Sequence, residues 1–137
     1  MKSDYYISFV VTTRNDEHGE NMPQKNQFFL DMWDKQVKKY NLNAELVIVE
    51  WNPESNKSLL KDKLNFPKLN KNQIIRIITV SNEEHKQFKN SDKLNIFQMI
   101  AKNVGIKRSN GKFILVTNID IIFSDKIFEF LSKKKLK

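Results

Sequence analysis

The chain has 137 residues, 39% of them hydrophobic, which suits one ordinary domain with a buried core. It contains no cysteine, which excludes disulfides, thiolate metal sites and a cysteine nucleophile, and fits a reducing, cytoplasmic setting. The first apolar stretch, residues 7–11, is too short for a signal sequence or a membrane span, so we expect a soluble protein. We predict one domain over residues 1–132 and a basic tail at residues 133–137.

The formal net charge of +8 raises the question of nucleic-acid binding, because Lys and Arg contacts to phosphates supply most sequence-independent affinity. The lysines are scattered along the chain, however, and the dense run is confined to the tail. This distribution is typical of a solvated basic surface and argues against a nucleic-acid partner.

The chain opens with a strand and a helix. Residues 7–12 form an unbroken β-branched and aromatic run that predicts a buried strand, and a polar loop follows at residues 13–19. An amphipathic helix comes next, because apolar residues recur at helical spacing. These residues are Phe29, Trp33, Val37 and Tyr40.

Two further strands follow in the middle of the chain. Residues 46–49 predict a second buried strand, with a loop opening at Glu50. A weakly helical piece at residues 59–64 leads to the third strand, residues 74–80. Ser81 is a candidate cap for the turn after that strand.

The last third predicts a helix over residues 92–108, a buried strand over residues 113–116 and a short helix over residues 126–131. Gly105 inside the first of these helices costs about 1 kcal/mol relative to alanine, so it indicates a close approach to another backbone.

Strands that are apolar on both faces and alternate with helices predict a doubly wound, mostly parallel α/β sheet. We expect about four core strands with helices on both faces. A free edge on the fourth strand would favour self-association, which leaves a homo-oligomer open.

Ligands of open α/β sheets bind outside the carboxyl ends of the strands. Because the chain has three glycines, it lacks both a glycine-rich dinucleotide fingerprint and a P-loop, so a bound nucleoside diphosphate would need a metal ion or basic side chains. The polar residues at the predicted strand ends include Thr13, Arg14, Glu50, Trp51, Asn118 and Asp120.

Four side chains can also be considered as metal ligands or as a stacking surface for a base. Asp120 is a candidate ligand for Mn²⁺ or Mg²⁺, which take one or two carboxylates and complete their shell with phosphate oxygens. For Trp51, packing is favoured over stacking on a base. His18 and His85 lack a second histidine at ligand spacing, and we expect both at the surface.

Four segments, in this order, resemble the amino-terminal half of family-2-type glycosyltransferases with the GT-A fold. They are residues 12–15, the strand that ends at Glu50, residues 101–105 and residues 117–120. The resemblance covers nearly the whole chain. It implies a nucleotide-diphospho-sugar transferase-like fold that binds a UDP- or GDP-type sugar.

The resemblance also implies roles for individual residues. In such enzymes the loop after the first strand and the acidic end of the second hold the base and ribose, here Thr13, Arg14 and Glu50. The pair Lys102 and Asn103 is similar to a helix-borne Arg-Asn pair that faces the nucleotide.

The family's Asp-x-Asp motif matches residues 118–120, with Asn118 in place of the first carboxylate. An amide can still bond a ribose hydroxyl, but one fewer negative charge weakens any metal held by Asp120.

Three classes of function follow. The first is a glycosyltransferase of hexosyltransferase type, whose catalytic base the resemblance places beyond this chain, so that the isolated residues transfer nothing efficiently. The second is a non-catalytic nucleotide-sugar-binding or protein-interaction module of the same fold. The third is a basic α/β domain for nucleic acid. The acceptor is not specified by any of these residues.

Overall fold

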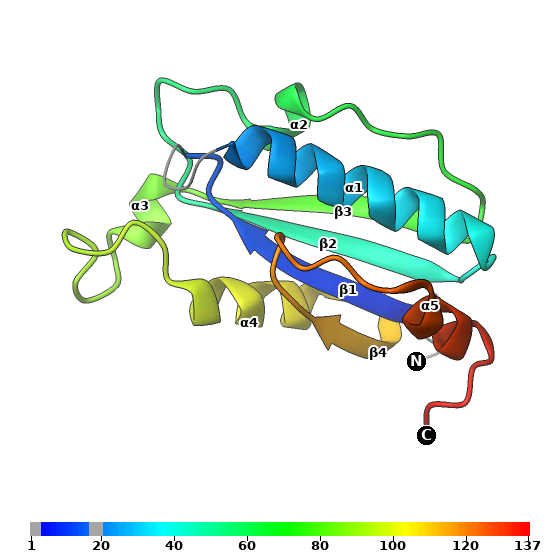
Figure 1. The fold of residues 1–137 in the computed structure, drawn as a ribbon. Helices are drawn as coiled ribbons and strands as arrows, with labels where there is room; N and C mark the ends of the chain where they lie inside the picture. The colour runs from blue at the N-terminus through cyan, green and yellow to red at the C-terminus, as the bar shows by residue number, and fades with distance from the viewer. Residues whose placement is uncertain (1–3, 17–20) are drawn as a thin grey trace.

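The computed structural model describes residues 4–16 and 21–137, and within these ranges four parallel strands form one sheet in the order β3-β2-β1-β4 (Figure 1). This confirms the predicted doubly wound α/β class. The strands are β1 (Tyr5–Thr13), β2 (Ala44–Trp51), β3 (Gln73–Val80) and β4 (Gly111–Val116).

The register of the sheet decides which strand ends meet. Thr13, Glu50 and Thr79 lie side by side on β1, β2 and β3. β4 ends earlier in the register than β1, because its last residue, Val116, pairs with Val10, whereas β1 continues to Thr13. The chain then continues along β1, where the Thr117 amide donates to the Val10 carbonyl at 3.0 Å. Residues 117–120 are therefore brought beside the end of β1.

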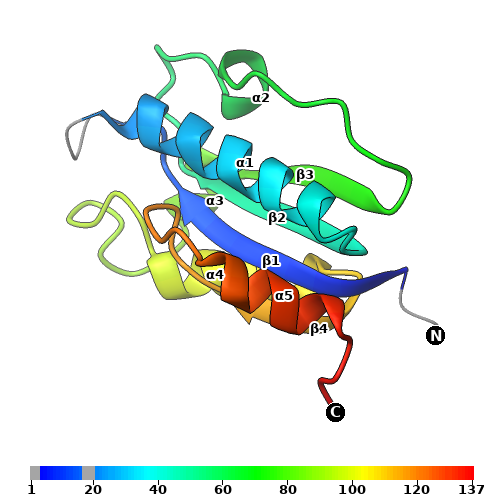
Figure 2. The ribbon, with the colours of Figure 1, turned by 45° about the vertical axis from the view of Figure 1, so that its right-hand side comes forward.

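Helices cover both faces of this sheet (Figure 2). The helices α1 (Met22–Lys39) and α5 (Asp125–Ser132) pack on one face, and α4 (Gln98–Arg108) packs on the other. Two short helices, α2 (Leu60–Lys63) and α3 (Asn82–His85), flank β3 in sequence. No helix within the described ranges is both long and apolar enough to cross a bilayer. The cytoplasmic location stays a prediction.

Alternating side chains of the strands supply both layers of the core. On the α1 face, Phe9 of β1 stacks on Phe128 of α5, with ring centroids 5.6 Å apart. On the α4 face, Val10, Val47 and Val49 pack against Ala101. Both central strands are therefore buried on two sides, which explains why they are continuous apolar runs.

Glu45 is a buried carboxylate on the α4 face of β2. It accepts hydrogen bonds from the Ser8 hydroxyl, from the Asn110 amide at 2.8 Å and from Arg76 Nη1 at 2.6 Å. Gly111 in turn donates to the Ser8 hydroxyl at 2.8 Å. These bonds fasten the turn between α4 and β4 to the amino ends of the central strands.

Three elements differ from their predicted form. Residues 92–97 are not helical, because α4 begins at Gln98 with Phe97 as its N-cap. The second strand continues through Glu50 to Trp51, since the pairing with β3 runs to that residue. The fourth strand is half exposed rather than buried. As an edge strand it leaves Ile114 and Val116 uncovered on the α4 face, 40% and 38% exposed.

A close approach at Gly105 is confirmed, but the prediction that another backbone lies there is wrong, because the neighbouring atoms belong to side chains. A Cβ atom there would lie 2.4 Å from Val10 Cγ1 and 3.1 Å from Val49 Cγ2. Both valines are fully buried and β-branched, so they have little room to rotate away. Gly105 therefore sets how closely α4 packs on the sheet.

We expect Gly105→Ala to lower the free energy of unfolding by about 1–2 kcal/mol, because overpacking outweighs the gain in helix propensity. Urea unfolding would measure this. The control is Lys107→Ala, an exposed position on the same helix, which should change stability by less than about 0.5 kcal/mol. Equal stability of the wild type and Gly105→Ala would contradict the packing argument.

Candidate functional site

A cleft of about 520 Å³ lies at the carboxyl ends of β1 and β4. Four segments line it: the end of β1 with the loop after it, the start of α1, residues 93–98 and residues 118–120. Its size is within the usual range for small-molecule sites, and it lies at the edge of the sheet where α/β folds bind ligands. A hollow of about 10 Å³ between α1 and residues 121–123 is too small for a ligand.

The β1 wall of the cleft carries two of the predicted residues, Thr13 and Arg14. Arg14 Nη1 contacts Asp16 Oδ2 at 2.8 Å, and its Nε donates to the Asn52 carbonyl at 2.8 Å. The Thr13 hydroxyl donates to Asn26 Oδ1 at 3.2 Å. The guanidinium is therefore held in a fixed position while it still has further donors to offer.

The opposite wall carries Asn118 and Asp120. The Asn118 carboxamide oxygen accepts hydrogen bonds from Lys102 Nζ at 2.8 Å and from Gln98 Nε2 at 3.1 Å. Lys102 does not line the cleft itself, but this contact brings its ammonium to the edge of it. Asp120 is exposed at the rim.

The fit of a divalent metal ion can be judged from these donors. Within the described residues, no three His, Cys, Asp or Glu side chains are grouped so that they could hold a metal ion. The Asn118 oxygen, which stands where the motif has a carboxylate, already bonds the ammonium of Lys102. Because Mn²⁺ and Mg²⁺ require several oxygen ligands, the donor set fits a resident ion poorly. Asp120 as a metal ligand stays a prediction.

Two predicted residues lie away from the cleft. Glu50 is fully buried on the α1 face, where it accepts hydrogen bonds from the Leu60 amide at 2.9 Å and from the Thr79 hydroxyl at 3.1 Å. Asn103 is exposed on α4 and does not line the cleft. Glu50 therefore holds α2 against the sheet, and its position does not support a contact with ribose.

Burial raises the pKa of Glu50, and its two hydrogen bonds only partly offset this effect. The folded protein thus resists ionisation of Glu50 more than the unfolded chain does. The contribution of Glu50 is greatest below the ordinary glutamate pKa of about 4.3 and is lost as the pH rises through the raised value.

We therefore expect the stability of the wild type, relative to Glu50→Gln, to fall as the pH rises from about 4 towards 7. Urea unfolding of both proteins across this range would measure the difference. Glu129→Gln, which removes an exposed carboxylate of α5, serves as the control. A constant difference between the wild type and Glu50→Gln would show that burial does not perturb this carboxyl.

The structure also shows where Trp51 and His85 lie, the two other residues whose role the sequence left open. Trp51 is 1% exposed, which confirms packing over base stacking. His85 is 2% exposed, so the prediction of a surface residue is wrong. Its ring packs against Phe97, and its Nδ1 accepts the Trp51 indole N–H at 2.8 Å. His18 lies outside the described residues.

A sequence signal for the burial of His85 does exist. Ser81 and Glu84 form a capping box, with the Ser81 hydroxyl accepting from the Glu84 amide and the Glu84 carboxylate accepting from the Ser81 amide. In such a box, the residue before the cap and the one after the acid face each other. Those positions are Val80 and His85, which points the histidine towards the sheet.

Sequence reasoning also missed some residues that line the cleft. Lys25 lies in the first turn of α1, and Lys93 belongs to the stretch that was expected to be helical. Gln98 begins α4 and lies within the predicted helix of residues 92–108. Single polar residues at the start of a helix or in an irregular segment carry no periodic signal, so no pattern in the sequence singled them out.

Comparisons of the chain with models of known protein families, with curated proteins and with solved structures gave no match. The class of protein is therefore defined by the fold alone. Over its described residues, the chain is a small α/β domain with a four-stranded parallel sheet and a polar cleft at the strand ends.

Proposed function

We propose that this domain binds a nucleoside diphosphate sugar, of UDP or GDP type, in the cleft at the ends of β1 and β4. It would serve as the nucleotide-binding half of a glycosyltransferase of the GT-A type. The observation that carries the proposal is the charge of the cleft. Its lining includes the cations Arg14, Lys25 and Lys93, and the ammonium of Lys102 lies at its edge.

A diphosphate needs positive charge, and this chain lacks the glycine-rich loops that supply it through backbone amides. Two carboxylates line the cleft, and one of them, Asp16, already pairs with Arg14. The lining thus has an excess of positive charge at the edge where α/β sheets bind ligands. This supports basic side chains as the partners of the diphosphate.

The sugar and ribose carry hydroxyl groups, which need acceptors as well as donors. Asp120 lines the cleft and can accept hydrogen bonds from such groups, and Thr13 lines it as well, although its hydroxyl already donates to Asn26. Glu50 has no part in this arrangement because it is fully buried.

Sugar transfer would also need a general base to deprotonate the acceptor as it attacks the anomeric carbon. The resemblance places that base outside the segments matched here. We therefore propose that these 137 residues bind the donor but turn it over poorly by themselves. Efficient acceptor-dependent turnover by the isolated chain would overturn this part of the proposal.

Calorimetric titration with UDP, GDP and their common sugar conjugates tests the binding. We expect micromolar affinity for one nucleotide, and we expect it to persist without Mn²⁺ because side chains supply the positive charge. A strict requirement for Mn²⁺, lost in Asp120→Asn, would instead establish the predicted metal ligand.

Matched lysine variants place the site. We expect Lys93→Gln to weaken nucleotide binding about tenfold, since a hydrogen bond to a charged group contributes on the order of 1.4 kcal/mol or more. Lys89→Gln removes the same charge from an exposed position of the same segment that does not line the cleft, and it should bind like the wild type. Equal losses in both variants would mean that only overall charge matters.

No binding of any nucleotide would favour the protein-interaction module. Binding of an oligonucleotide that falls steeply with added salt and does not compete with UDP or GDP would favour the nucleic-acid domain.

A further inference from the structure

The wall of the cleft opposite α1 is built from a segment without regular structure. Residues 86–97 connect α3 to α4 without a regular element (Figure 1), and residues 93–96 of this segment line the cleft. Its backbone hydrogen bonds are local turn bonds, such as that from the Leu94 amide to the Asn90 carbonyl at 3.0 Å, and they shape the segment without pairing it to the sheet. Side-chain contacts hold it against the sheet.

His85 makes one of these contacts with both nitrogens of its ring. The indole N–H of Trp51 can only donate, so His85 Nδ1 must accept at their distance of 2.8 Å. The carbonyl of Ser91 can only accept, so Nε2 must carry the hydrogen at 3.1 Å. A single neutral tautomer satisfies both bonds, and it links the end of the central strand to the middle of the segment.

Asn52, the residue that follows β2, makes a second contact with the segment. Asn52 Nδ2 donates to the Asn95 carbonyl at 3.0 Å, and Asn82 of α3 donates to Asn52 Oδ1 at 2.8 Å. The carbonyl of Asn52 also accepts from Nε of Arg14. The corner formed by Trp51 and Asn52 thus fixes both the irregular wall and the arginine that faces it.

We propose that His85 is a positioning residue for the cleft, which through Trp51 and Ser91 sets the wall carrying Lys93 at a fixed distance from Arg14. Its effect on ligand binding rests on the proposed nucleotide site, but its effect on the wall does not. His85 does not line the cleft, so it acts through the segment rather than by touching a ligand.

The surroundings of the ring allow a substitution that separates hydrogen bonding from packing. Phe97 lies 5.1 Å from the His85 ring, and Phe88 and Phe97 both pack on Trp51. His85→Phe retains an aromatic ring among these neighbours but removes both hydrogen bonds. His85→Gln retains a donor near the position of Nε2, and so can keep the bond to Ser91 alone.

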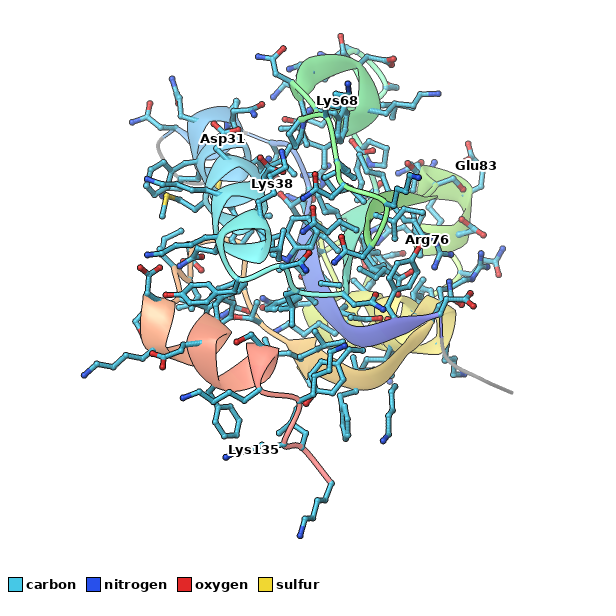
Figure 3. All side chains as sticks on the ribbon, turned by 90° about the vertical axis from the view of Figure 1, so that its right-hand side faces the viewer. Asp31, Lys38, Lys68, Arg76, Glu83 and Lys135 are labelled. Carbon is cyan, nitrogen blue, oxygen red and sulfur yellow. The ribbon has the colours of Figure 1, made fainter. Side chains whose placement is uncertain are left out.

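The first measurement is hydrogen–deuterium exchange of the free protein. In His85→Phe we expect amides of residues 86–97 to exchange about tenfold faster, while those of β1 and β2 stay unchanged. His85→Gln should lie between this variant and the wild type. The matched control is Gln87→Ala, an exposed position in the same segment. His85 differs in this respect from its neighbour on α3: the side chain of Glu83 points away from the body of the protein (Figure 3), whereas the ring of His85 is buried.

The second measurement is the affinity of these variants for the nucleotide that the wild type binds. We expect His85→Phe to weaken binding about tenfold and Gln87→Ala to leave it unchanged.

Unchanged exchange in His85→Phe, or faster exchange with unchanged affinity, would overturn the positioning role. If the wild type binds no nucleotide, the proposed function fails, and exchange alone decides whether His85 fixes the wall. If His85→Phe does not fold, His85→Gln decides the same questions.

Discussion

The central strand β2 is buried along all eight of its residues, yet it carries two carboxylates and an indole N–H. A buried polar group destabilises a protein unless it is hydrogen bonded, so each of these three groups requires a partner inside the fold. Ser8, Arg76 and Thr79 on the neighbouring strands supply some of these partners. Each of the three groups also has a partner outside the sheet: Asn110 for Glu45, Leu60 for Glu50 and His85 for Trp51. The hydrogen bonds of one strand therefore fix α2, α3 and the turn before β4 against the sheet.

The hydrogen bonds at the two ends of β2 hold different parts of the protein in place. At the amino end, Glu45 and Arg76 fasten the turn between α4 and β4, which lies at the opposite end of the sheet from the cleft, so these bonds contribute to stability. At the carboxyl end, Trp51 and Asn52 hold a segment that lines the cleft. The positive φ of 49° at Asn52 turns the chain sharply there, which lets consecutive side chains reach two parts of the segment. The geometry of the cleft thus depends on the carboxyl end of β2, whereas both ends contribute to stability, through Glu45 and Glu50.

The strands could be predicted closely because β-branched runs bounded by polar loops have few alternatives. The partners of buried polar residues could not, since they depend on residues far apart in sequence. His85 lies 34 positions from Trp51, and no local pattern joins them. Residues 92–97 show a related limit. Ile96 and Phe97 pack against the core with the α4 face, so their apolar spacing continued the helical pattern although the backbone there forms turns.

In the candidate site, too, the residues at the strand ends could be predicted but their hydrogen-bond partners could not. Thr13, Arg14, Asn118 and Asp120 could be predicted, because parallel strands release the chain at one edge of the sheet. The contact between Lys102 and Asn118 could not, because it joins a residue of α4 to the loop after β4. The ammonium of Lys102 donates directly to the Asn118 carboxamide oxygen, so a cation of the protein itself lies beside that oxygen. If the cleft binds a diphosphate as we propose, the ligand would meet this fixed charge without a metal ion to carry it.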